Sequence, residues 1–178
     1  LQVVTGVHMA DGPSTGWAGP SCGGGNNGDW YVYTPSFTGT ITITSCHPLN
    51  SMGLDDTYLK VYSGTCAQLA CIGYNDDMLA NACPDFGFAS YMEVSVVAGQ
   101  NYYIVWTNLF NSNSFYWELN ECVGTVTGVT YADNNDNAIR DLGEGQVDVM
   151  LQVQPEGSFV FAGQDPYSFC SNAGPHTV

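Results

Sequence analysis

Between residues 30 and 119 the sequence alternates apolar and polar side chains with a period of two. Ile41 and Ile43 alternate with threonines, and Leu59 and Val61 alternate with larger polar side chains. The same pattern recurs at residues 30–33, 91–96, 104–106 and 115–119, and glycine-containing turns separate the runs. No stretch has the period of an amphipathic helix. Short, regularly spaced strands of this kind predict an all-β fold, namely a β-sandwich.

The charge balance restricts the partners of the chain. Two residues are Lys or Arg and seventeen are Asp or Glu, for a net charge of −15. Binding to nucleic acid or to an anionic membrane surface requires clustered basic residues, so neither is expected. No apolar run approaches the length of a transmembrane span, so no membrane insertion is expected either. The acidity instead favours cation binding, which would relieve the repulsion between carboxylates.

Seven cysteines without C-x-x-C pairs indicate disulfides rather than a zinc site, and therefore an oxidising, extracellular location, either secreted or on the cell surface. The short spacing between Cys66 and Cys71 predicts a local disulfide. The longer-range expectations are Cys46 with Cys83 and Cys22 with Cys122, which leave Cys170 as the remaining thiol.

One twelve-residue segment, 133–144, has the oxygen spacing of a calcium-binding loop. Its expected ligands are at positions 1, 3, 5, 7, 9 and 12, where position 7 binds through its backbone carbonyl: Asp133, Asn135, Asn137, Ile139, Asp141 and Glu144. Oxygen-only ligands favour Ca²⁺ over transition metals. Position 6, usually glycine, is Ala138, and the flanking segments 125–131 and 147–153 have strand patterns rather than helical ones. The alternative is a solvated Asp/Asn-rich turn that binds no metal.

A strand, a D-x-N-x-N-x-x-x-D-x-x-E loop and a second strand resemble the calcium-loaded, prealbumin-like B-repeat of Sdr-type surface proteins. The segment 163–169, GQDPYSF, is similar to that family's hairpin motif. The resemblance implies a second domain over residues 122–178, a partial prealbumin-like (Ig-like) β-sandwich. Its pattern has fewer strands than such a sandwich, so we expect completion by further residues of the same polypeptide or by a strand of a neighbouring copy.

Residues 1–121 carry a second resemblance. The segments are WYVYTP at 30–35, GTITI at 39–43, DTYLKVYSGTC at 56–66, NDD at 75–77 and AGQNYYI at 98–104. They resemble the pre-peptidase C-terminal, CUB-like jelly-roll modules of secreted Bacteroidetes proteins with type IX secretion, which are non-catalytic accessory parts. The resemblance implies a second Ca²⁺ site at an acidic corner formed by Asp55, Asp56, Asp76 and Asp77. The alternative is that the first two cap a strand and the last two form a plain turn.

Sequence motifs of catalysis are missing. There is no H-E-x-x-H and no G-x-S-x-G, and His8, His47 and His176 are scattered, so we expect no enzyme. With essentially no linker between its two domains, the chain is expected to be a calcium- and disulfide-stabilised segment of a surface stalk, adhesin or filament. Its partners would be other copies or further domains of the same surface protein. The alternative is a carbohydrate- or protein-binding accessory module of a secreted enzyme, with glycans stacking on tyrosines such as Tyr31, Tyr33, Tyr58, Tyr62, Tyr91, Tyr103 and Tyr116.

Overall fold

The computed structural model describes residues 1–13, 15–50, 56–77, 83, 88–122, 124–152, 159–162 and 166–171. Every regular element in these segments is a β-strand, so the expected all-β fold is confirmed. None of the described residues forms a helix that could cross a membrane.

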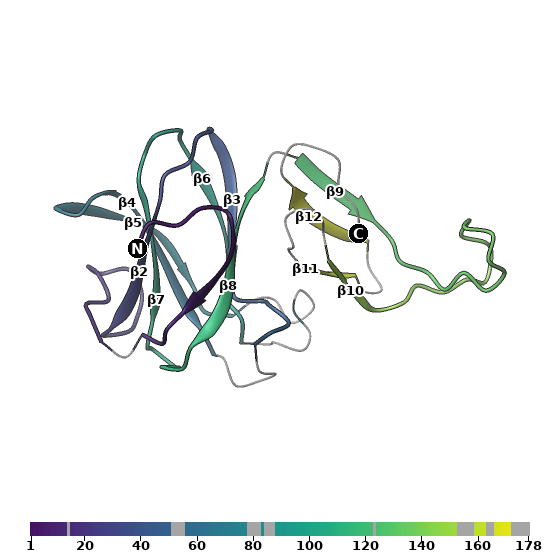
Figure 1. The fold of residues 1–178 in the computed structure, drawn as a ribbon, viewed down its shortest axis with the longest axis horizontal. Coiled ribbons are helices and arrows are strands. Elements are labelled where there is room, and N and C mark those ends of the chain that lie inside the picture. Colours follow the sequence, from purple (N-terminus) through teal and green to yellow (C-terminus); the bar gives the residue numbers. More distant parts are fainter. Residues whose placement is uncertain are drawn as a thin grey trace.

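Two antiparallel four-stranded sheets form the larger part of the molecule (Figure 1). The first sheet has the order β1 (Gly6–Ala10), β8 (Phe115–Cys122), β3 (Gly39–Thr44), β6 (Tyr91–Val96). The second has the order β2 (Gly28–Tyr33), β7 (Tyr102–Thr107), β4 (Tyr58–Thr65), β5 (Gln68–Asn75). The two sheets form a β-sandwich, in which β1 pairs with β8, β2 with β7, β3 with β6 and β4 with β5.

The core lies between the two sheets and consists of the apolar members of the alternating runs. Ile41 and Ile43 of β3, Leu59 and Val61 of β4 and Trp117 of β8 are all fully buried. Their alternation with outward-facing residues places every second side chain in the core, because side chains of a strand point to opposite faces in turn. The hydrophobic pattern therefore accounts for the register of both sheets.

The outer face of the second sheet is covered by the chain segment 15–27, which precedes β2. Lys60 belongs to the polar set of its strand, yet it is only 2% exposed, and its Nζ donates a 3.2 Å hydrogen bond to the carbonyl of Ala18. Burial lowers the pKa of Lys60. Tyr62, also on the outer face, is fully buried and donates to the carbonyl of Pro20 at 2.9 Å. The covering segment is thus tied down by hydrogen bonds from β4.

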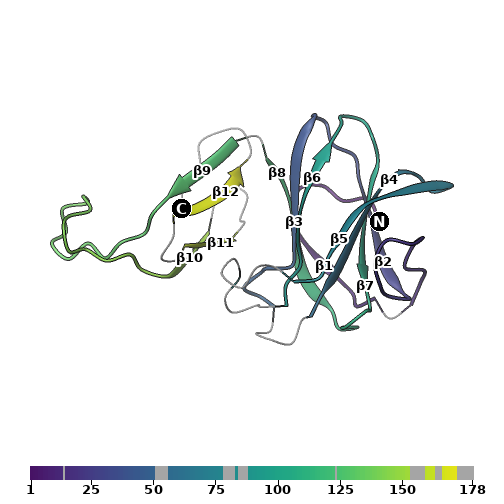
Figure 2. The ribbon, with the colours of Figure 1, turned by 180° about the vertical axis from the view of Figure 1, so that it is seen from behind.

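The remaining strands form two small antiparallel sheets beyond β8. The strands β9 (Gly124–Gly128) and β12 (Tyr167–Ser171) form one pair, and β10 (Val149–Gln152) and β11 (Phe159–Ala162) form the other. The figures place them on the side of the first sheet, away from the second sheet (Figures 1 and 2). The strands that flank the acidic loop, β9 and β10, therefore pair with later strands rather than with each other.

Candidate metal centre

Three carboxylates meet at one end of the sandwich. Oxygen atoms of Asp56, Asp76 and Asp77 all lie within 4.8 Å of one another. Asp56 lies just before β4, and the other two directly follow β5, whose last residue pairs with Leu59 of β4. Antiparallel pairing of these two strands therefore brings together the acidic residues expected at this corner. Asp55, the fourth expected residue, lies outside the described residues.

Two of these carboxylates are partly removed from water. Burial raises the pKa of Asp56, and the charges of Asp76 and Asp77 raise it further. Burial also raises the pKa of Asp76, followed by the charge of Asp77. Among the described residues, none donates a hydrogen bond to the buried Oδ1 atom of either Asp56 or Asp76. A buried acceptor without a donor destabilises a fold by about 1–3 kcal/mol, and by more when it is charged.

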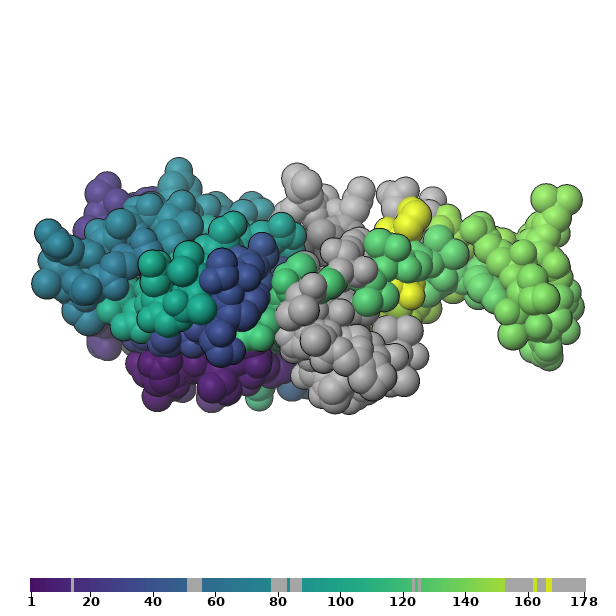
Figure 3. All heavy atoms as spheres, turned by 90° about the horizontal axis from the view of Figure 1, so that it is seen from above, coloured from purple at the N-terminus to yellow at the C-terminus, as the bar shows by residue number. Residues whose placement is uncertain are grey.

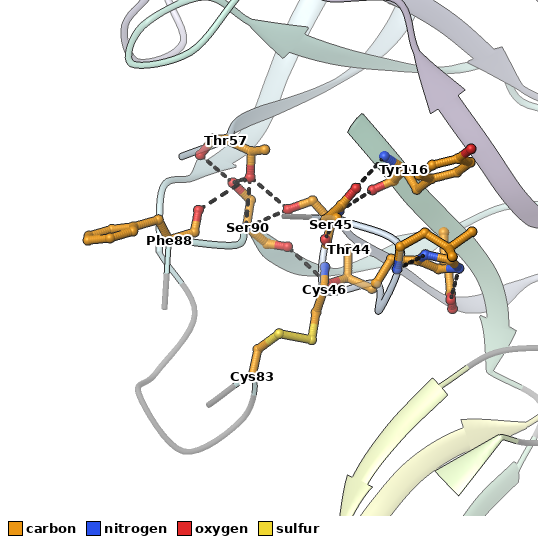
Figure 4. Close-up of a disulfide and its surroundings, with 12 residues drawn as sticks. Thr44, Ser45, Cys46, Thr57, Cys83, Phe88, Ser90 and Tyr116 are labelled. Carbon is orange, nitrogen blue, oxygen red and sulfur yellow. Dashed lines mark hydrogen bonds and ion pairs between the residues drawn. A yellow bond between two sulfur atoms is a disulfide. The ribbon is translucent and has the colours of Figure 1, made fainter. Parts of the chain in front are cut away.

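A buried hydroxyl network holds the two acidic segments together (Figure 4). Oγ of Ser90 lies 2.7 Å from the carbonyl oxygens of both Thr57 and Asp76. Ser45 Oγ lies 2.7 Å from Thr57 Oγ1 and accepts a 2.9 Å hydrogen bond from the amide of Ser90. Because Thr57 follows Asp56 directly, this network sets the spacing between the carboxylates.

The disulfide Cys46–Cys83 lies next to the network and links the segment after β3 to the loop between β5 and β6 (Figure 4). Asn75 supports the same corner, since its Oδ1 accepts a 2.8 Å hydrogen bond from the amide of Tyr91. A disulfide and hydrogen bonds from four segments of the sandwich thus hold the acidic corner in place.

The chemistry of this cluster fits a hard divalent cation. Its ligand atoms are carboxylate oxygens, without the sulfur or imidazole nitrogen that favours transition metals. Ca²⁺ takes six to eight oxygen ligands, so three carboxylates would supply part of its coordination. A cation here would also give the two buried Oδ1 atoms the partner that they lack among the described residues. Ca²⁺ binding at Asp56, Asp76 and Asp77 stays a prediction.

The acidic loop 133–144 projects at the end of the molecule that is formed by β9–β12 (Figures 1 and 3). Its base is a short antiparallel ribbon, in which the amide of Ala132 donates to the carbonyl of Gly145 at 3.0 Å. Glu144 is buried, and its two carboxylate oxygens accept hydrogen bonds of 2.9 Å from the amides of Asn134 and Asp141. The last residue of the loop thereby closes it onto its first half.

The side chains expected as ligands bond to the loop itself. Asp133 accepts from the amides of Asn137 and Ala138, and the latter bond is the main cause of the lowered pKa of Asp133. Asn135 and Asn137 donate to Oδ2 of Asp141 at 2.8 and 2.7 Å, which lowers the pKa of Asp141. Side-chain-to-backbone bonds of this kind occur in turns with or without a metal. Cation binding by this loop, including the carbonyl of Ile139, therefore also stays a prediction.

The disulfide connectivity corrects two of the three expected pairs. Cys46 pairs with Cys83 as expected, but Cys71 pairs with Cys22, and Cys66 is an exposed free thiol. In the β4–β5 hairpin Thr65 pairs with Gln68, so Cys66 lies in the turn, whereas Cys71 lies opposite Tyr62. The extended strand separates the two cysteines by more than a disulfide can span.

The expected pair Cys22–Cys122 is also wrong, because Cys22 is bonded to Cys71 on the edge strand β5. Cys122 is disulfide-bonded as well. The side chain of Cys170, expected to be the remaining thiol, lies outside the described part of the structure. Among the described cysteines the free thiol is Cys66.

The tyrosines expected to stack on sugars are mostly inaccessible. Five of them are at most 6% exposed: Tyr31, Tyr33, Tyr58, Tyr62 and Tyr103. The exposed rings are others, above all Trp17 at 62% and Tyr74 at 56%. Sequence alternation missed them because Trp17 lies in a turn-rich segment and Tyr74 lies on β5, which is an edge strand among the described strands.

Comparisons with known proteins add no family to these observations. A scan against protein-family models, a search of curated proteins and a search of solved structures each found no match.

Proposed function

We propose that this chain is a non-catalytic extracellular structural module that Ca²⁺ and disulfides stabilise, a segment of a cell-surface stalk, adhesin or filament. The observation behind the proposal is the convergence of Asp56, Asp76 and Asp77 with two buried carboxylate oxygens that lack donors among the described residues. Mutual repulsion at this corner destabilises the metal-free fold, and a bound Ca²⁺ would reverse that effect.

The disulfides support the extracellular part of the proposal. Cys22–Cys71 and Cys46–Cys83 close separations of 49 and 37 residues, and such bonds persist in oxidising compartments. The junction between the two parts of the chain supports a role in a stalk, because β8 ends at Cys122 and β9 begins at Gly124. A connection this short transmits force and orientation better than a flexible linker does.

Thermal unfolding of the chain with Ca²⁺, with Mg²⁺ and with a chelator tests the proposal. We expect Ca²⁺ to raise the melting temperature, with a stabilisation of about 2.7 kcal/mol at a hundredfold excess over its Kd. Asp76→Asn should remove the part of the shift that belongs to the sandwich, and Asp133→Asn the part that belongs to the loop. Asp148→Asn, at an exposed acid outside both sites, serves as the control. Equal melting temperatures with Ca²⁺ and with chelator would refute the proposal.

A further inference from the structure

Two exposed aromatic rings lie at the outer face of the second sheet: Trp17 stacks on the partly buried Trp30, and Tyr74 stacks on the buried Tyr58. Trp17 is the outermost of three nearly parallel rings: its centroid lies 5.8 Å from that of Trp30, which lies 5.8 Å from that of Tyr62. The indole N–H of Trp30 also donates to the carbonyl of Trp17. Exposure therefore falls from 62% at Trp17 to zero at Tyr62.

Tyr74 repeats this arrangement on the edge strand β5. Its ring stacks on Tyr58 with centroids 5.7 Å apart and planes 16° apart, and Tyr58 is 5% exposed. Phe110, 54% exposed, contacts the same Tyr58 at 6.2 Å. Gly23 passes so close that a β-carbon there would meet Tyr58 and Tyr74 at 2.3 and 2.9 Å. The supporting Tyr58 and Tyr62 are four residues apart on β4, about 13 Å at ~3.3 Å per residue.

The segment that carries Trp17 is fixed at several points along its length. Besides the bonds from Lys60 and Tyr62 already described, the disulfide Cys22–Cys71 ties it to β5. Further along, the amide of Gly24 donates to Tyr58 Oη at 3.2 Å, and the amide of Asn27 donates to Asn108 Oδ1 at 2.9 Å. Binding to rings that are already ordered loses little conformational entropy, which is the physical basis of preorganised recognition.

We propose that this face binds a neutral polysaccharide, with sugar rings stacked on Trp17 and Tyr74. The C–H face of a pyranose packs against the electron-rich face of an aromatic ring, while the hydroxyl groups stay in water. The inference goes beyond the structural role proposed above and is independent of Ca²⁺.

The charge of the chain and the arrangement of its exposed rings favour a neutral polysaccharide over an acidic glycan or a protein partner. The chain has a net charge of −15, and Lys60, one of its two basic residues, is buried, so acidic glycans would be repelled. A protein partner would need a contiguous apolar patch as the centre of its interface. Here Trp17 and Tyr74 stack on different rings, Trp30 and Tyr58, which suits an extended ligand with repeating rings.

The position of the face fits such a role. The second sheet lies at the opposite end of the molecule from β9–β12 (Figures 1 and 2). A ligand bound there would not contact β9–β12 or the acidic loop.

Affinity electrophoresis in gels that contain neutral polysaccharides tests the proposal: hydroxyethyl cellulose, xyloglucan, glucomannan, mixed-linkage β-glucan and dextran. Pull-down with insoluble cellulose and chitin extends the set. At least one polymer should retard or capture the chain, in the presence of chelator as well as Ca²⁺. Trp17→Ala and Tyr74→Ala should each weaken that binding roughly tenfold, whereas Tyr74→Phe, which keeps the ring, should retain it.

Met9→Ala is the matched control, because Met9 is 51% exposed on the first sheet and should not affect binding. Circular dichroism and the melting temperature of every variant separate loss of binding from loss of fold. No binding to any of the seven polymers overturns the proposal, as does binding that both alanine variants retain. Dissociation of a wild-type dimer by Trp17→Ala, without polymer binding, would overturn it as well and assign the face to self-association. Because chelator is included, failure here does not bear on the Ca²⁺ sites.

Discussion

The backbone amide of Ala138 donates a 2.8 Å hydrogen bond to Oδ2 of Asp133, and Ala138 itself has a φ of 59°. The left-handed conformation lets the chain fold back so that position 6 of the loop faces position 1. Glycine is usual at this position because it adopts the left-handed conformation without strain. For an L-residue with a β-carbon, the same conformation is about 1–2 kcal/mol less stable than the right-handed one. Ala138 therefore adopts the left-handed conformation that the loop requires, but at a cost in conformational energy.

Replacing Ala138 with glycine should relieve this strain and strengthen any cation binding by the loop. We expect a gain of up to about 1 kcal/mol, or roughly fivefold in Kd, measured by calorimetric titration with Ca²⁺. Gly143→Ala is the matched opposite change, since Gly143 has a φ of 99°, and it should weaken binding. Weaker binding by Ala138→Gly would show that its φ does not limit the loop.

The acidic corner predicts an unusual pH dependence of the metal-free protein. The pKa values of Asp56 and Asp76 are raised above 3.8, so the folded state binds their protons more tightly than the unfolded state does. Their protonation therefore favours folding below pH 3.8, and this contribution is lost as the pH rises through the folded-state pKa. The Asp56→Asn, Asp76→Asn double variant should unfold with a flatter pH profile just above pH 3.8 than the wild type. Identical profiles would contradict the coupling.

Much of this architecture follows from local pattern. The alternation around Ile41, Ile43, Leu59 and Val61 predicts both the strands and the buried face, because a pleated strand has only two faces. The corner formed by Asp56, Asp76 and Asp77 was predicted only through a family resemblance, since pairing between separate strands is not visible in either segment alone.

Other features depend on contacts that no local pattern encodes. Cys22 reaches Cys71 because the segment before β2 crosses the outer face of the second sheet, and the same crossing buries Lys60 and positions Trp17. The alternation correctly predicts that Lys60 points to the outer face of its sheet. It contains no information about the segment that covers this face and buries Lys60. Sequence proximity favoured Cys66–Cys71, although the hairpin register keeps these two residues apart.

Ser90 should be required for the geometry of the acidic corner. Ser90→Ala removes the hydroxyl that contacts the carbonyls of Thr57 and Asp76, and leaves the carbonyl to which it donates without this hydrogen bond. We expect a loss of about 1–3 kcal/mol in the free energy of unfolding, together with weaker Ca²⁺ binding. Ser95→Ala, at an exposed position of β6, is the control, and chemical denaturation with and without Ca²⁺ is the measurement. An unchanged Ca²⁺ response in Ser90→Ala would mean that the carboxylates are positioned by other contacts.

The pairing of the cysteines can be tested by chemical modification and by substitution. Cys66 is exposed in the β4–β5 turn, so an alkylating reagent should modify it in the native protein, and Cys66→Ser should leave the melting temperature unchanged.

The double variant Cys22→Ala, Cys71→Ala should lose about 4 kcal/mol in the free energy of unfolding, because that bond closes a separation of 49 residues in the unfolded chain. It should also loosen the segment that holds Trp17, which fluorescence quenching by acrylamide would report as greater accessibility. Peptide mapping without reduction identifies the pairs directly. A peptide linking Cys66 to Cys71 would refute the hairpin register and, with it, the anchoring of the covering segment.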